Sequence, residues 1–153
     1  MKVFKVLGCT ALTFVLSSCA TGPDVPGMSE MLRESTGQNG RACVRLSDIR
    51  GYGVLENDVV SIDGRTEYYL ATVLPGCTDL QTSVRTLFRG DFGEVCGQTM
   101  DSLSTRGDTC TINQMFEFDN REEAFATFND ILDRRKEMKR LASEQRGVVK
   151  SDY

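Results

Sequence analysis

Four cysteines in the middle of this 153-residue chain limit the folds it can adopt: Cys43, Cys77, Cys96 and Cys110. Their separations of 34, 19 and 14 residues include no Cys-x-x-Cys pair. That spacing argues against zinc sites, iron–sulfur clusters and thioredoxin-like redox sites, and we expect neither a metal nor a cofactor. Whether the four form disulfides depends on the compartment, because disulfides persist where conditions are oxidising.

The first 18 residues have the pattern of an export signal. Lys2 and Lys5 give a short basic start, and residues 6–16 form an apolar run that is too short to span a bilayer. The run ends in Leu16-Ser17-Ser18-Cys19-Ala20, which resembles the lipobox of bacterial lipoproteins.

The resemblance to a lipobox implies that residues 1–18 are removed and that Cys19 becomes the lipid-carrying first residue of the mature chain. Several fatty acyl chains of the palmitate type would then hold the protein on the membrane. Ala20, where other lipoproteins have aspartate, resembles the sorting signal for the outer membrane. We therefore expect a cell-envelope protein on the periplasmic face of that membrane. The alternatives are an uncleaved anchor and a plain secretory signal with a chance cysteine.

An even number of cysteines remains in the exported domain once Cys9 leaves with the signal and Cys19 is acylated. This predicts two disulfides among the four in the middle of the chain. Three connectivities are possible. We favour Cys77–Cys96 with Cys43–Cys110, because the second bond would tie the first strand region to the last.

The segment that follows the lipidated residue, 19–40, is rich in glycine and proline. Met28, Met31 and Leu32 are its only apolar patch among polar residues. This composition predicts a flexible tether.

Residues 41–118 carry the pattern of a β-rich domain. Runs rich in β-branched and aromatic residues predict strands at 54–55, 59–62 and 66–74, and further strands at 84–88, 95–100 and 111–118. Asp63-Gly64 predicts a tight hairpin turn between the second and third of these. The sequences at 90–93 and 106–108 are typical of turns, so we interpret Asp91-Phe92-Gly93 as a turn and not as a kinase motif.

The final segment, 119–153, predicts an amphipathic helix over about 121–143. Asn120 and Glu123 form a capping box. Apolar residues then recur at helical spacing, as expected for core packing: Phe125, Phe128, Leu132, Met138 and Leu141. The fold class is thus α+β, a small antiparallel sheet that is barrel- or sandwich-like, with two disulfides and a C-terminal helix.

A basic cluster lies on this helix at residues 134–140. It suits a solvated helix face with Asp130, Asp133 and Glu137 as ion-pair partners. The alternative is contact with anionic lipid or a cell-wall polymer.

Charge and composition exclude several functions. The net charge is −4, and loss of Lys2 and Lys5 makes it more negative, which argues against binding nucleic acid. The chain has no histidine, so the commonest general base and the Ser-His and Cys-His systems are excluded. We expect no catalytic residues and no enzymatic activity. We expect the strand aromatics to fill the core and not a ligand pocket: Tyr52, Tyr68, Tyr69, Phe88 and Phe92.

The order of several short motifs resembles a family of small bacterial envelope proteins, the domain of unknown function 6491. These motifs are Arg41-x-Cys43-Val44, Tyr68-Tyr69-Leu70, Cys77-x-x-Leu80, Cys96, and Cys110-Thr111-Ile112 with Phe116. The likeness covers about residues 41–118, and the long terminal helix departs from it. It implies these domain limits and exported disulfides, and it assigns no catalytic residue.

A membrane-anchored envelope protein that binds another envelope protein or a cell-wall polymer without catalysis is the function we expect. The alternative is a small-ligand binder or a hydrolase at the membrane surface, which a polar cleft with perturbed carboxylates would favour.

Overall fold

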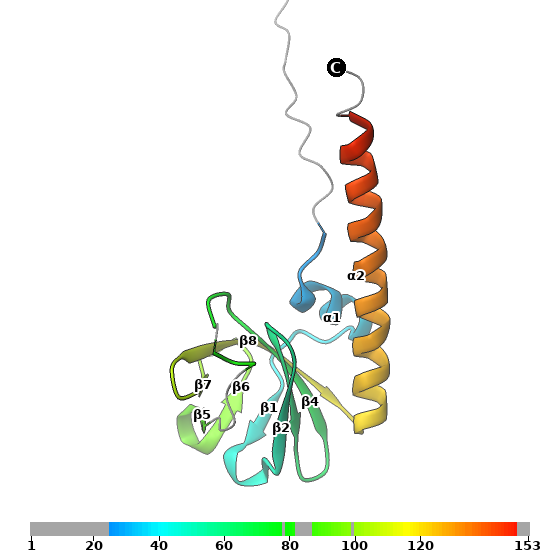
Figure 1. The fold of residues 1–153 in the computed structure, drawn as a ribbon. Helices are drawn as coiled ribbons and strands as arrows, with labels where there is room; N and C mark the ends of the chain where they lie inside the picture. Colours follow the sequence, from blue (N-terminus) through cyan, green and yellow to red (C-terminus); the bar gives the residue numbers. More distant parts are fainter. Residues whose placement is uncertain (1–24, 78, 82–86, 99, 150–153) are drawn as a thin grey trace, which may run out of the picture.

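A computed structural model describes residues 25–149, apart from 78, 82–86 and 99. The predicted signal and Cys19 lie outside the described residues. The described chain forms two α-helices, eight strands and two short 3-10 turns (Figure 1). The elements are α1 (Met28–Thr36), β1 (Cys43–Arg45), η1 (Leu46–Asp48), β2 (Gly51–Glu56), β3 (Val59–Asp63), β4 (Tyr68–Val73), β5 (Leu87–Arg89), η2 (Asp91–Gly93), β6 (Glu94–Cys96), β7 (Ser102–Ser104), β8 (Thr109–Phe118) and α2 (Arg121–Val149).

The strands form one six-stranded antiparallel sheet and one two-stranded ladder. The order in the larger sheet is β2-β3-β4-β8-β7-β5, and β1 pairs with β6 in the ladder. Tyr52 on β2 and Phe88 on β5 belong to opposite edges of the sheet, yet their ring centroids lie 6.0 Å apart. The sheet is therefore curled, and the predicted α+β class with a curled antiparallel sheet is confirmed.

The core has two parts, one on each face of the sheet. The inner part is enclosed by the curled sheet and the ladder, and it includes Val44, Ile62, Tyr69, Val95, Leu103, Ile112 and Met115. The outer part lies between the sheet and both helices, and it includes Leu32, Leu70, Phe116, Phe118, Phe128 and Ile131. Figure 1 shows α1 and α2 side by side against the sheet.

The hairpin of β3 and β4 confirms the predicted alternation. Tyr68 and Leu70 belong to the outer part of the core, whereas Tyr69, Ala71 and Val73 belong to the inner part. The predicted two-residue turn was wrong in detail, because the strands are joined by residues 64–67, where Gly64 N–H donates to the carbonyl of Glu67 at 3.1 Å. Gly64 does not have a positive φ.

Strand β8 contains a bulge that lets it serve both parts of the core. Thr72 pairs with Gln114 and Val73 pairs with Ile112, so Asn113 is an extra residue in the β4–β8 register. The extra residue changes the phase of alternation. Ile112 and Met115 consequently both face the inner core although they are three residues apart.

Three of the short strands differ from the sequence prediction: β1, β6 and β7. Strand β7 and the first strand, β1, were not predicted, because three residues are too few for a period-2 pattern to stand out. The predicted strand at 95–100 ends at Cys96, and Met100 lies outside it. Of the predicted strand at 84–88, residues 84–86 lie outside the described residues. The turn predicted at 106–108 is confirmed between β7 and β8.

The predicted tether is wrong for residues 28–36, which form helix α1. Met28, Met31 and Leu32 recur at helical spacing, and each is at most 2% exposed. Ser29 Oγ lies 2.7 Å from Thr72 Oγ1 on β4 and accepts a hydrogen bond from the Asn113 amide at 3.0 Å. The apolar patch is thus part of the outer core, and α1 is docked on the sheet.

Helix α2 begins at Arg121, as predicted, and continues to Val149, beyond the predicted end at 143. The predicted cap by Asn120 is confirmed, while the Glu123 side chain reaches the N–H of the residue before Asn120 and not that of Asn120 itself. The Glu123 N–H donates to Asn120 Oδ1 at 2.9 Å, and the Glu123 carboxylate accepts the N–H of Asp119 at 3.2 Å. The predicted apolar stripe packs against the outer part of the core from Phe125 as far as Met138, whereas Leu141 is 45% exposed.

The predicted disulfide connectivity was wrong. The bonds are Cys43–Cys96 and Cys77–Cys110, with Cα separations of 4.1 and 5.4 Å. The prediction failed because it assumed that a disulfide joins the first strand region to the last. Instead β1 is paired with β6, where Cys43 and Cys96 lie directly opposite each other. Cys110 faces the inner core, where Cys77 packs at its margin.

Replacing Leu32 with alanine should destabilise the oxidised domain by about 2–5 kcal/mol, because the side chain is fully buried between α1, α2 and the sheet. Urea unfolding measures this change. Glu34→Ala on the exposed side of α1 is the matched control and should cost under about 0.5 kcal/mol. Equal stabilities for the two variants would show that α1 is a detachable tether.

Candidate functional site

The segment Leu87–Met100 has the most exposed apolar side chains of the described chain. Phe92 is 103% exposed, Met100 80% and Leu87 59%. Two other large apolar residues are exposed in the described part, and each is under half exposed. We call Leu87–Met100, without residue 99, the exposed segment. It contains β5, the 3-10 turn η2 and β6.

The backbone of the exposed segment adopts unusual conformations. Phe92, Gln98 and Met100 have φ angles of 57°, 66° and 68°, and among the described residues no other non-glycine residue has a positive φ. Such residues cost of order 1–3 kcal/mol each, and they cluster at functional sites in many proteins.

Close backbone contacts hold the segment against the rest of the domain. A Cβ on Gly90 would lie 1.8 Å from the carbonyl oxygen of Glu94, and one on Gly97 would lie 2.0 Å from that of Gly40. Glycine is therefore required at both positions. The turn Asp91-Phe92-Gly93 is confirmed, and its conformation is fixed by these contacts and not by burial of Phe92.

Hydrogen bonds on both sides of Cys96 add to this restraint. The Cys96 N–H donates to Asp101 Oδ2 at 2.7 Å, and the Gly97 N–H donates to the Ala42 carbonyl at 3.1 Å. The next N–H, that of Gln98, donates to the Asn113 carbonyl at 3.0 Å. The segment is thus exposed but firmly placed.

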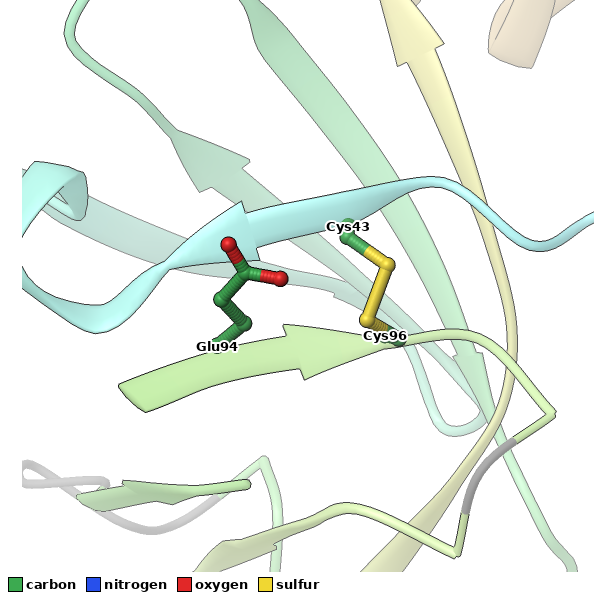
Figure 2. Close-up of side chains that lie close together, drawn as sticks. All are labelled: Cys43, Glu94 and Cys96. Atoms are coloured by element: carbon green, nitrogen blue, oxygen red, sulfur yellow. A yellow bond between two sulfur atoms is a disulfide. The ribbon is translucent and has the colours of Figure 1, made fainter. Parts of the chain in front are cut away.

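The ladder of β1 and β6 carries one disulfide and one carboxylate on the same face (Figure 2). A sulfur of Cys43, a sulfur of Cys96 and a carboxylate oxygen of Glu94 all lie within 4.8 Å of one another. Metals bind cysteine as the thiolate, so these sulfurs do not supply metal ligands while they are bonded to each other. Arg45, opposite Glu94 in the ladder, approaches its carboxylate with 3.6 Å between Nε and Oε1.

Two surface depressions lie elsewhere on the domain. One of about 460 Å³ lies at the end of α1 and is lined by Glu30, Arg33, Glu34, Gly37, Gln38 and Asn39. The other, of about 510 Å³, is lined by Asn57, Asp58 and residues 73–77. Neither includes a residue of the exposed segment.

Tyr69 lies among acidic groups at the side of the inner core. Burial, and then the nearby charges of Glu117 and Glu67, raise its pKa to about 12. The phenol is thus held protonated through the physiological range and hydrogen bonds with Glu117. This arrangement keeps a buried hydroxyl satisfied and supplies no base.

The basic cluster on α2 has partners on its own helix, as predicted for a solvated face. Arg134 pairs with Asp130 at 3.0 Å and Lys136 with Asp133 at 3.2 Å. Arg140 pairs with Glu137, and hydrogen bonding from this guanidinium lowers the pKa of the Glu137 carboxyl. Within the described residues, no helix is both long enough and apolar enough to cross a membrane.

Comparison with known proteins identifies the family. The model of a family of unknown function, DUF6491, matches residues 2–127. The chain belongs to this family. The match is longer than the resemblance predicted, since it includes α1 and the start of α2, and the rest of α2 lies outside it. No curated protein and no solved structure matches this DUF6491 member.

The structure places the predicted site residues unevenly. Cys43, Cys77, Cys96 and Cys110 are all in disulfides, while Cys19 lies outside the described residues. Of the aromatics predicted to fill the core, Tyr68, Tyr69 and Phe88 are buried and Tyr52 is half-buried. Phe92 is the exception. A lone apolar residue in a four-residue turn with glycine at both ends is the sequence signal that was missed.

Replacing Phe92 with asparagine should leave the free energy of unfolding unchanged or raise it by up to about 1 kcal/mol, because asparagine tolerates a left-handed backbone and no buried contact is lost. Denaturant unfolding tests this. Phe88→Ala in the same segment is the control, and it should cost about 3–5 kcal/mol because Phe88 is buried. A similar loss for the Phe92 variant would mean that Phe92 is a packing residue.

Proposed function

We propose that this protein is a lipid-anchored protein of the bacterial cell envelope and that it acts there as a non-catalytic interaction module. The exposed segment is its contact surface, and another envelope protein is its partner. The single observation that carries the proposal is the full exposure of Phe92 on a firmly held turn.

The anchor is supported by the sequence of residues 1–20. The basic start, the apolar run and the lipobox at Leu16–Ala20 agree with one another. The match to the DUF6491 family begins at residue 2 and so includes this segment. Two disulfides in the domain fit an exported protein.

A contact role suits Phe92 better than a packing role. Buried aromatics dominate the energetics of protein interfaces, and those that are already fixed in place lose little conformational entropy on binding. The ring of Phe92 is fully exposed, while its backbone is held by the close contact between Gly90 and Glu94. It is therefore placed to enter a recess on a partner.

The charges next to Phe92 favour a protein partner over a lipid surface. Asp91 and Glu94 flank the ring on either side in the sequence. Arg45 partly offsets the charge of Glu94 at 3.6 Å, and the Asp91 carboxylate would be repelled by anionic headgroups. Arg89 is the one cation of the segment. A protein pocket with a basic rim fits this pattern, and exposed polar groups around an aromatic anchor are typical of interface rims.

Replacing Cys19 with serine should abolish lipidation, because the lipobox cysteine receives the acyl chains. Feeding cells an alkyne-bearing fatty acid and coupling the alkyne to a dye after purification measures this. Cys9→Ser is the matched control and should keep the label. Equal labelling of wild type and the Cys19 variant would contradict the anchor.

A photo-crosslinking residue at position 92 should capture one abundant envelope protein in living cells. A second variant at this position, Phe92→Asn, then measures how much the ring contributes to binding. The same crosslinker at Leu141, exposed on α2, is the position control and should not capture that protein. With the captured partner purified, Phe92→Asn should weaken binding by at least about 30-fold, as expected for an interface anchor worth over 2 kcal/mol.

Two outcomes would contradict this assignment. If the crosslinker at position 92 captured lipid alone, Phe92 would contact the membrane surface and not a protein partner. Equal binding by wild type and Phe92→Asn would remove Phe92 from the interface and favour the small-ligand alternative, whose site would then be sought at the depression next to Asp58.

A further inference from the structure

We propose that Cys43–Cys96 is a site of reversible thiol–disulfide exchange with a dithiol protein, whereas Cys77–Cys110 is a structural bond. This inference does not depend on the proposed contact role of Phe92. It starts from the different surroundings of the two disulfides.

The two bonds differ in the access they give to an attacking thiolate. Cys43 is exposed and Cys96 is half-buried, and their bond lies on the face of the two-stranded ladder (Figure 2). In the other bond, Cys77 is half-buried and lines the depression beside Asp58, and Cys110 is 2% exposed and belongs to the inner core, so neither of its cysteines is an exposed residue. Exchange requires a thiolate to reach a sulfur along the S–S axis, so the rate depends on access. Cys43 Sγ is the accessible target.

The exchange reaction balances with a dithiol as the co-reactant. A thiolate of the partner forms a bond to Cys43 Sγ, the S–S bond breaks, and its electron pair goes to Cys96 Sγ, which takes up a proton. The second thiol of the partner then attacks the mixed disulfide and frees Cys43. Two electrons and two protons pass to the protein, and the partner leaves as a disulfide.

Charges beside the bond set the rate in a predictable direction. The Glu94 carboxylate lies within 4.8 Å of both sulfurs, and its negative charge disfavours a thiolate on Cys96 as it leaves. A leaving thiol of higher pKa leaves more slowly. Arg45 partly offsets this charge through its 3.6 Å approach to Glu94. The negative charge of Glu94 thus slows exchange at Cys43–Cys96.

The fold keeps the two cysteines in place after the bond is broken. Val44 and Val95 face each other in the same ladder, and both are buried in the inner core. The Cys96 N–H remains bonded to Asp101, and the Gly97 N–H to the Ala42 carbonyl. Reduction is therefore local, and the bond can re-form without refolding.

The test uses the oxidised protein as purified from the producing cells without reductant. Dithiothreitol is added under native conditions, aliquots are quenched with N-ethylmaleimide, and peptide mass spectrometry gives the reduction rate of each disulfide. We expect Cys43 and Cys96 to be alkylated at least about tenfold faster than Cys77 and Cys110, because access differs between the two bonds. Equal rates, or faster reduction of Cys77–Cys110, would overturn the proposal.

Two further measurements separate exchange from a merely exposed bond. A thioredoxin-type protein in which the second active-site cysteine is serine should be trapped as a mixed disulfide on Cys43, and trapping on Cys77 would contradict the assignment. In the Glu94→Gln variant, dithiothreitol should reduce the Cys43–Cys96 bond several-fold faster than in wild type. The control Glu122→Gln, exposed at the start of α2, should be unchanged. Equal rates for Glu94→Gln and wild type would remove the role of Glu94.

Discussion

The backbone hydrogen bonds of β8 extend in three directions, and the other elements take their positions from them. The strand pairs with β4 over most of its length and with β7 over residues 109–111. At Met115 its N–H and carbonyl bond to Gly40 and Ala42, the residues that lead into β1. Its bulge directs side chains to both parts of the core. Because β8 leads through Phe118 to the cap of α2, one strand joins the sheet, the ladder and the long helix.

Local patterns in the sequence were enough to predict the parts of the fold that local interactions determine. The alternation at 68–73 predicted the hairpin faces, and the Asn120–Glu123 box predicted the start of α2 to the residue. Each of these depends on neighbours within a few positions. For the curled sheet, the sequence predicted the fold class but not the strand order. The closure of the sheet depends on contacts between distant residues, such as that of Tyr52 with Phe88.

The features that the sequence did not reveal depend on distant contacts. Four cysteines allow three pairings. The observed choice follows from the antiparallel pairing of β6 with β1, and no short sequence pattern predicts that pairing. Helix α1 has three apolar residues in nine and resembles a polar linker until the sheet is present to cover them. Phe92 was misassigned because aromatics usually contribute to a core. It is instead fully exposed, on a turn where its own φ is 57°.

The division of α2 has a consequence for how this family can vary. Residues 121–138 pack against the sheet and α1, and the match to DUF6491 ends within that part, at residue 127. Beyond Met138 most described side chains are exposed, apart from Ala142. Because each added turn extends a helix by about 5.4 Å without altering the turns before it, chains of this kind can change the helix length and keep the same β domain. The part of α2 beyond Met138 thus has few buried side chains to constrain it, Ala142 being one, while the attached part is constrained by the outer core.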